Sequence, residues 1–307
     1  MPSAISYVSV GVADMQAVKA LWIDLLGLEV VARRQGPDPE LARLWGLRAD
    51  DIRDQLLLQT PAAQTGRLHF VEFANPGAAI RENAAPYDLG AKNLDVNCDA
   101  MPEKIVQLRA AGYAFRSDMV EYELEGVRAR EVQMPAHDGL NVVFIEVLSD
   151  GFETPYSSRG FAAVTSFVVI VEDTASEAEF YKAVFGLDEI LQHNLAGPDI
   201  EKVIGLPKGA ALQMRLCGTA DNMFGRMELI TYEGLSGADR FTTAQPAATG
   251  ILRCGFDIDS MDSFVASAAA NNIVVTEPKQ TDAIYGTGRI ASLNSPAGLR
   301  IEVLESA

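Results

Sequence analysis

The sequence has few residues of the kinds that build disulfide frameworks, metal clusters or basic surfaces. Its 307 residues include only three cysteines, three histidines and two tryptophans. Cys98, Cys217 and Cys254 are widely spaced and lie in apolar, strand-like runs, so they predict neither a disulfide framework nor a zinc knuckle. We interpret them as small core residues of a protein from a reducing compartment, and we expect a cytoplasmic location.

Positive charge is scarce, with 25 Lys and Arg residues against 42 Asp and Glu residues and a formal net charge of −17. Nucleic acids and anionic membranes both require a basic surface, so neither is expected as a partner. No run of about 18 apolar residues occurs, which argues against a membrane span. No basic residue precedes Lys19, which argues against a signal peptide. The acidic surface favours solubility and suits a cationic ligand.

The chain contains an internal repeat at an offset of 159 residues, which pairs Asp14 with Asp173 and Gly27 with Gly186. At this offset ISYVSVGVAD (5–14) matches VTSFVVIVED (164–173) and GRLHFVEF (66–73) matches GRMELITY (225–232), while NLDVNCDAM (93–101) matches RCGFDIDSM (253–261) at an offset of 160. A repeat of this length indicates a tandem duplication. We predict modules at 1–150 and 160–307, joined by a Gly-, Pro- and Ser-rich linker at 149–160.

Hydrophobic periodicity predicts the order of elements within each module. Residues 6–12 alternate, with Val8, Val10 and Val12 on one face of a strand. Asp14 is placed to cap a helix that Gly27 ends. Further strands are expected at 66–74, from 93, at 127–134 and at 140–148, with a helix at 101–111. Each module therefore contains two units of strand, helix and three strands.

These motifs resemble those of the vicinal oxygen chelate superfamily, which includes glyoxalase I, type I extradiol dioxygenases, methylmalonyl-CoA epimerase and bleomycin-resistance proteins. The resemblance lies in Tyr7, Asp14 and LGL (26–28), in Ser166, Asp173 and FGL (185–187), and in SPAGLRIEV (295–303). It implies an α+β fold of four βαβββ units that form two tandem glyoxalase-like modules. Each module would contain a curved mixed sheet around a cavity, and a pseudo-twofold axis would relate the two.

The resemblance also implies where a metal would bind, and the sequence departs from that pattern. Metal-binding relatives use cavity-facing residues of the first and last strands of each unit. The corresponding residues here are Tyr7, His69, Asn93 and Val143 (or Glu146 with a three-residue insertion) in the first module, and Ser166, Glu228, Arg253 and Glu302 in the second. An extradiol dioxygenase needs two His and one Glu around iron. Neither module offers two His, so ring cleavage is disfavoured.

In the second module, the expectation is that Ser166, Glu228, Arg253 and Glu302 line one cavity. Arginine is permanently cationic and only donates hydrogen bonds, so Arg253 disfavours a metal there. Two carboxylates around a guanidinium either form a self-satisfied ion pair or bind an anionic substrate group. We accordingly assign Arg253, Glu228 and Glu302 to substrate binding.

In the first module, one strand face carries Tyr7, Ser9, His69, Asn93, Asp95 and Asn97. Polar groups on such a face are costly unless they are paired or wet, so a wet pocket is expected. We predict His69 as the proton carrier, because its reference pKa lies near neutrality. Tyr7 and Asn93 would orient a substrate oxygen and Asp95 would hold a partner. Ser9 and Asn97 would bind substrate, although His69 could equally be a hydrogen-bonded strand residue.

No cofactor is predicted, and a divalent metal, if bound, would use His69 and Glu146. The resulting hypothesis is a metal-independent isomerase or lyase of small-molecule catabolism that acts on a carbonyl or hydroxylated, partly apolar substrate. The alternative is a protein that binds or sequesters a small molecule, as the bleomycin-resistance branch does. The partner in both cases is a small molecule. The sequence leaves a homodimer open and does not name the substrate.

Overall fold

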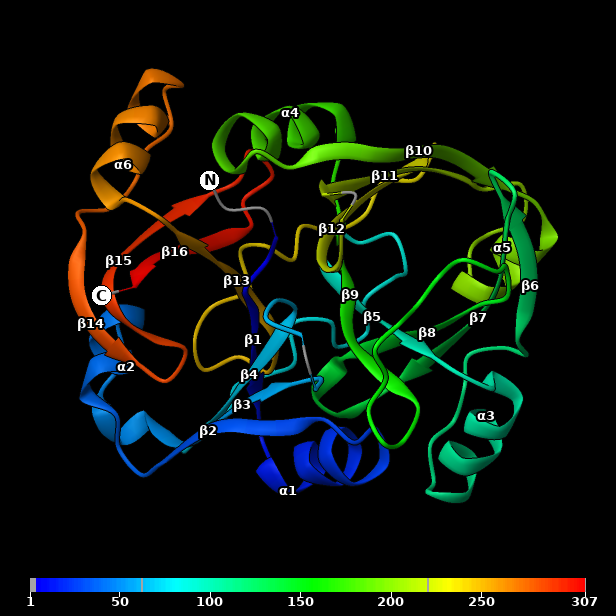
Figure 1. Ribbon diagram of the computed structural model, residues 1–307, viewed down its shortest axis with the longest axis horizontal. Helices are drawn as coiled ribbons and strands as arrows, with labels where there is room; N and C mark the ends of the chain where they lie inside the picture. Colours follow the sequence, from blue (N-terminus) through cyan, green and yellow to red (C-terminus); the bar gives the residue numbers. More distant parts are fainter. Residues whose placement is uncertain (1–3, 62, 220, 307) are drawn as a thin grey trace.

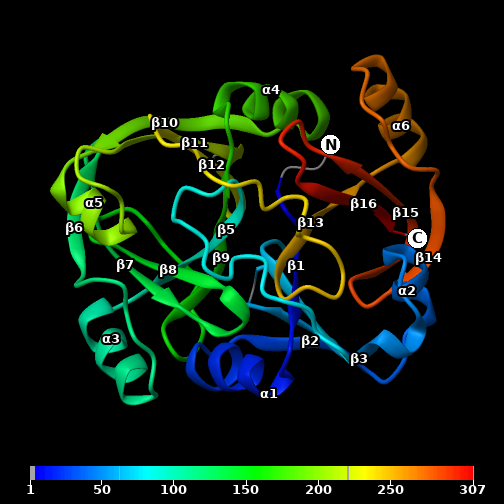
Figure 2. The same cartoon turned by 180° about the vertical axis from the view of Figure 1, so that it is seen from behind.

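A computed structural model describes residues 4–61, 63–219 and 221–306 of the chain. Its strands form two curved, mixed sheets with helices packed around them (Figures 1 and 2). The elements fall into four consecutive units of strand, helix and three strands. The predicted α+β fold with curved mixed sheets is confirmed.

Units 1 and 2 occupy the first half of the sequence. Unit 1 comprises β1 (Tyr7–Val12), α1 (Met15–Val18) continuing as a π-helix (Lys19–Leu25), β2 (Glu29–Gln35), α2 (Pro39–Trp45), a 3₁₀ turn (Ala49–Asp51), β3 (Ile52–Gln59) and β4 (Arg67–Phe73). Unit 2 comprises β5 (Gly90–Cys98), α3 (Met101–Ala110), β6 (Val120–Leu124), β7 (Val127–Pro135), a 3₁₀ turn (His137–Gly139) and β8 (Asn141–Val147).

Units 3 and 4 repeat this order in the second half. Unit 3 comprises β9 (Phe161–Ile170), α4 (Thr174–Phe185), β10 (Asp188–Ala196), α5 (Pro198–Ile204), β11 (Ala211–Thr219) and β12 (Asn222–Glu233). Unit 4 comprises β13 (Gly250–Ile258), α6 (Met261–Ala270), β14 (Lys279–Ala283), β15 (Gly286–Asn294) and β16 (Arg300–Ser306).

Local sequence signals explain where the first helices begin and end. The Asp14 carboxylate accepts a hydrogen bond from the Gln16 backbone N–H, and Asp173 accepts equivalent bonds at the start of α4. These are N-cap interactions, which satisfy backbone donors that the helix itself leaves free. Gly186 ends α4 in the left-handed conformation, where glycine has no steric penalty. The predicted caps are thus confirmed.

Each sheet combines units from opposite halves of the sequence. The outer-unit sheet has the order β14-β15-β16-β13-β1-β4-β3-β2 and unites units 1 and 4. The inner-unit sheet has the order β10-β11-β12-β9-β5-β8-β7-β6 and unites units 2 and 3. Antiparallel pairing joins the two units of each sheet, β1 with β13 in the outer-unit sheet and β5 with β9 in the inner-unit sheet. These four strands cross the middle of the molecule in Figure 1.

Strand register preserves the repeat offset. In the outer-unit sheet Tyr7 pairs with Arg67, and in the inner-unit sheet Ser166 pairs with Arg226, so both partners move by 159 positions. The two sheets are therefore related by the pseudo-symmetry that the sequence predicts.

The helix-covered faces of both sheets share one large hydrophobic core. This cluster contains Val8, Val10 and Val12 of β1, which confirms the predicted alternation, together with Cys98, Cys217 and Cys254. The three cysteines are buried and free, as expected for core residues. None of the helices in the described ranges is long and apolar enough to cross a membrane.

Because each sheet needs both halves of the chain, we expect neither half to fold as a monomer. Splitting the chain between Asp150 and Gly151 would separate β1 from its partner β13 and β5 from its partner β9. The backbone groups along these strand edges would then be unpaired and exposed. Co-expressed fragments 1–150 and 151–307 should purify together in equal amounts, and each alone should aggregate or self-associate. Size-exclusion chromatography and circular dichroism measure this, and a folded, monomeric 1–150 fragment would contradict it.

Candidate functional site

The two sheets place related residues at equivalent positions on their concave faces. Strand register aligns Tyr7 with Ser166 and His69 with Glu228. In the same way, Asn93 corresponds to Arg253 and Val143 to Glu302. The ungapped alignment that places Val143 opposite Glu302 is therefore right.

The predicted combinations of site residues are wrong, because strands from opposite halves meet in each sheet. Ser166 and Glu228 lie in the inner-unit sheet, whereas Arg253 and Glu302 lie in the outer-unit sheet. The predicted first-module face is divided likewise. Tyr7, Ser9 and His69 belong to the outer-unit sheet, and Asn93, Asp95 and Asn97 belong to the inner-unit sheet. Local periodicity placed each side chain on the correct face but could not show which strands become neighbours.

In the outer-unit sheet, a buried carboxylate is saturated by hydrogen bonds. Glu302 accepts from the Tyr7 hydroxyl at 2.9 Å, from Trp45 Nε1 at 2.9 Å, from Arg253 Nη1 at 2.8 Å and from the Tyr285 hydroxyl at 3.1 Å. Burial, followed by the charge of Glu302, raises the pKa of Tyr7 well above its ordinary value. Charge-assisted bonds of this kind compensate for the desolvation of both ions.

His69 is enclosed in the same sheet. Its Nδ1 lies 3.0 Å from Ser9 Oγ and its Nε2 lies 3.1 Å from Gln55 Oε1, and the side chain has no exposed surface. Burial, together with the charge of Arg253, lowers the pKa of His69 to about 3. The ring therefore stays neutral near pH 7 with both nitrogens occupied. The alternative interpretation of His69 as a hydrogen-bonded strand residue agrees with this geometry, and the proton-carrier role does not.

Large side chains fill the centre of the outer-unit site where the inner-unit site has small ones. A Cβ atom at Gly255 would lie 2.2 Å from the Tyr7 ring, so the ring occupies space that a side chain would need. The residue equivalent to Gly255 is Asp95, and the residue equivalent to Tyr7 is Ser166. Trp45 of α2 likewise corresponds, at the offset of 159, to the smaller Ile204 of α5. The inner-unit sheet therefore keeps an open cavity.

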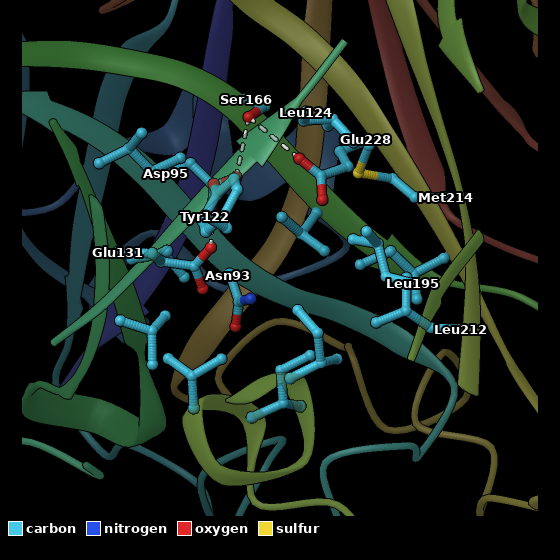
Figure 3. A pocket seen from close by; sticks show the side chains of 18 of the residues that line it. Asn93, Asp95, Tyr122, Leu124, Glu131, Ser166, Leu195, Leu212, Met214 and Glu228 are labelled. Carbon is cyan, nitrogen blue, oxygen red and sulfur yellow. Dashed lines mark hydrogen bonds between the residues drawn. The ribbon is translucent and has the colours of Figure 1, made fainter. Parts of the chain in front are cut away.

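That cavity has a volume of about 480 Å³, which is within the range of small-molecule sites. Its walls are largely apolar and come from β6, β8, β10, β11 and helix α5. Leu124, Leu195, Leu212 and Met214 face the polar base of the cavity in Figure 3. The predicted residues Asn93, Asp95, Asn97, Ser166 and Glu228 all line it.

At the base, Ser166 joins two carboxyl groups from adjoining strands. Its hydroxyl lies 2.8 Å from Asp95 Oδ2 and 3.4 Å from Glu228 Oε2 (Figure 3). Burial, followed by the charge of Glu228, raises the pKa of Asp95 well above its ordinary value. Burial also raises the pKa of Glu228 to about 7. Two adjoining buried carboxyl groups resist double ionisation, so the pair holds a proton more readily than two separate carboxyl groups would.

A third acidic group, Glu131, and a basic group, Lys92, line the same cavity. Glu131 accepts hydrogen bonds from Tyr122 at 3.4 Å and Gln133 at 3.2 Å, and burial raises its pKa. Lys92 Nζ lies 3.0 Å from the Tyr232 hydroxyl, and burial lowers its pKa to about 7. Strong pKa shifts in one cavity mark a candidate site for proton transfer.

The sequence analysis missed Lys92, Tyr122, Glu131 and Tyr232. Glu131 and Lys92 lie in or beside strands that the hydrophobic periodicity predicted. Glu131 lies in the predicted strand at 127–134, and Lys92 directly precedes the predicted strand that begins at Asn93. Their convergence depends on the pairing of β5, β7 and β12 within one sheet, which local periodicity does not reveal.

The residues do not fit the divalent metal that the fold suggests. In the outer-unit sheet, Glu302 already accepts four hydrogen bonds and Arg253 occupies a ligand position. In the inner-unit sheet, the fourth equivalent position is Val143, which has no donor atom. No cluster of three or more His, Cys, Asp or Glu in the described ranges is arranged to hold a metal ion. We derive no chemical step through a metal.

The fallback metal pair of His69 and Glu146 is also wrong. His69 is in the outer-unit sheet, whereas Glu146 is on the helix-covered side of β8. There it accepts a hydrogen bond from the Met101 backbone N–H at 3.1 Å and pairs with Arg130 at 3.4 Å. The two side chains cannot share an ion.

Comparison with known proteins identifies the fold. No protein-family model matches the chain, and no curated protein matches its sequence. Glyoxalase I from Zea mays superposes with a TM-score of 0.67 at 13% identity, over 98% of this chain and 92% of that one. A candidate dioxygenase from Bacillus subtilis superposes with a TM-score of 0.61 at 14% identity, over 99% of this chain and 86% of that one. These likenesses show that the chain shares the fold of these two proteins.

Proposed function

We propose that the inner-unit cavity binds a partly apolar small molecule and catalyses proton transfer on it without a metal. The observation that carries this proposal is the Asp95–Ser166–Glu228 cluster at the base of an otherwise apolar cavity. A neutral carboxylic acid beside an ionisable one supplies a hydrogen-bond donor and a base in a single site, as general acid–base catalysis requires.

The proposed reaction begins at a carbon next to a substrate carbonyl. Ionised Glu228 takes the proton, and the C–H electron pair forms a C=C bond as the carbonyl electrons move to oxygen. Protonated Asp95 stabilises that oxygen by donating a hydrogen bond. In an α-hydroxyketone, Asp95 gives its proton to the enolate oxygen, Glu228 returns its proton to the former carbonyl carbon, and the other hydroxyl group loses its proton to Asp95; the carbonyl has then moved by one carbon, which completes an isomerisation. In a β-hydroxyketone, the enolate electrons re-form the carbonyl and break the bond to the β-hydroxyl group, which takes the proton from Glu228 and leaves as water, and this completes a lyase reaction.

Other groups support this arrangement. Ser166 holds the two carboxyl groups in register, since its hydroxyl contacts both. Asp95 Oδ1 is buried without a hydrogen-bond partner, so one face of the acid is available to a substrate oxygen. Asn93 and Asn97 line the same cavity and supply further polar contacts. The apolar walls select a substrate with an apolar body and exclude water from the reacting atoms.

A binding function is the second candidate, and a separate observation favours it. The cavity is lined by six acidic groups, Asp95, Glu121, Glu123, Glu131, Asp199 and Glu228, against two basic ones, Lys92 and Arg226, whose pKa values burial lowers. A cationic, partly apolar compound would complement those charges without being transformed.

Replacement of Glu228 tests the enzymatic proposal. α-Hydroxyketones and aryl alkyl ketones are incubated with protein in D₂O, and loss of the C–H signal is followed by ¹H NMR. We expect catalysed exchange with at least one of these compounds. Glu228→Gln should slow it by about 10²-fold or more, because general bases contribute that much.

Glu233→Gln is the matched control, because Glu233 is exposed at the end of the same strand. It should leave exchange unchanged. If no compound exchanges, while a cationic compound binds and Glu228→Gln weakens that binding, the protein is a binder. Equal exchange in Glu228→Gln and the unmodified protein would show that another group is the base.

The pH dependence of stability tests the electrostatics of the cluster independently of any substrate. Burial raises the pKa of Glu228 from 4.5 to about 7, so the folded state binds the proton more tightly than the unfolded state. Stability from this group is therefore fully present below about pH 4.5 and is lost as the pH rises towards 7. Relative to Glu228→Gln, the unmodified protein should lose free energy of unfolding over that window and then level off.

Urea unfolding at pH values from 4.5 to 8 measures this difference. Glu233→Gln should track the unmodified protein throughout. A constant difference between Glu228→Gln and the unmodified protein across the window would contradict the raised pKa of Glu228.

A further inference from the structure

A second cavity, with a volume of about 600 Å³, is lined by residues of units 1 and 4 together with Phe180 of α4. Its charged lining residues are Arg253 and Arg300, and no Asp or Glu is among the described residues that line it. The protein as a whole carries a formal net charge of −17. The charged side chains that line this cavity are therefore opposite in sign to the net charge of the protein.

Arg253 is buried, and only one of its three guanidinium nitrogen atoms has a hydrogen-bond partner. Its side chain is 5% exposed, Nη1 donates to Glu302 at 2.8 Å, and its guanidinium carbon lies 4.3 Å from the centre of the Trp45 ring. The Nε and Nη2 atoms are buried and have no hydrogen-bond partner. Buried donors on a charged group are costly when unpaired, and a guanidinium presents them in a planar fork that matches an oxoanion.

Arg300 adds a second positive charge to the same cavity. Its Nη2 donates to Gln245 Oε1 at 2.5 Å, so a neutral acceptor holds it and its charge is not neutralised there. Partial burial, and then the charge of Arg253, lowers its pKa. The two guanidinium groups thus repel each other, and an anion between them would remove the repulsion.

The other residues that line this cavity indicate which kind of ligand it can hold. Leu44, Phe180, Ile273 and Val274 contribute apolar surface, while Thr276, Ser292 and Asn294 are polar. Val274 is 86% exposed, and Asn272 and Asn294 are exposed as well, so the rim opens to solvent. The cavity is large enough for an anion attached to an apolar group of small-molecule size.

We propose that this second cavity is a binding site for an organic carboxylate with an apolar body, held by Arg253 and Arg300. The hydrogen bond to Glu302 and the contact with the Trp45 ring fix the orientation of the Arg253 guanidinium. Its free Nε and Nη2 atoms would donate two hydrogen bonds to the carboxylate. The site is distinct from the acidic inner-unit cavity, so it does not depend on the proton-transfer proposal.

The two tryptophans provide a selective probe. Trp45 lines the second cavity, whereas Trp22 is fully buried and donates to His137 Nε2 at 3.2 Å. Sodium benzoate, neutral benzamide and sodium phosphate are titrated at constant ionic strength, and the two indole N–H resonances are followed by NMR. Benzoate should shift the Trp45 resonance saturably and leave Trp22 unmoved, and benzamide and phosphate should bind at least tenfold more weakly.

Arg300 is the residue to replace, because loss of Arg253 would leave Glu302 buried without its partner. Arg300→Gln should raise the Kd for benzoate by tenfold or more. Arg289→Gln is the control, since Arg289 is paired with Asp262 at 2.7 Å and lies outside the cavity lining. Absence of a saturable Trp45 shift, equal binding of benzamide, equal binding of phosphate, or an unchanged Kd in Arg300→Gln would each overturn the proposal.

Discussion

Hydrogen bonding between first strands from opposite halves of the chain is the constraint on which the rest of the structure depends. The β1–β13 and β5–β9 seams unite unit 1 with unit 4 and unit 2 with unit 3. A curved sheet of four strands has an open edge and an uncovered concave face, and pairing with a second unit removes that edge. The seams therefore decide which residues share a cavity. The Asp95–Ser166–Glu228 cluster lies on a concave face assembled in this way.

Duplication followed by a change in side-chain size explains why the two concave faces differ. Tyr7 and Trp45 fill the centre of one site around Glu302, and Ser166 and Ile204 leave the centre of the other open. The filled site gains packing and a saturated carboxylate, which supports stability. The open site keeps carboxyl groups that are desolvated but incompletely paired, and that condition raises their pKa values.

The electrostatics of the two cavities are opposite in sign. Asp95, Glu131 and Glu228 make the inner-unit cavity acidic, and Arg253 with Arg300 makes the second cavity basic. In each case burial amplifies the effect of a few charges, because low-dielectric surroundings screen them weakly. Net charge alone would have suggested only a cationic ligand. The local arrangement instead separates the proposed proton-transfer site from the proposed anion site.

The amino-acid sequence by itself determined the repeat, the order of strands and helices, the N-caps at Asp14 and Asp173, and the face on which each side chain lies. These follow from short-range periodicity and capping, which need only neighbouring residues. The ion pair between Arg253 and Glu302 is one of the two alternatives that the sequence offered, and it is confirmed. The sequence did not determine that Asp95 meets Glu228, or that Arg253 meets Arg300. Those pairs are 133 and 47 residues apart (228 − 95 and 300 − 253). Only the tertiary structure decided them, because sheet pairing is a long-range contact whose partner a single strand does not specify. His69 is enclosed while its equivalent, Glu228, lines the open cavity, because large side chains fill the outer-unit site and small ones leave the inner-unit site open.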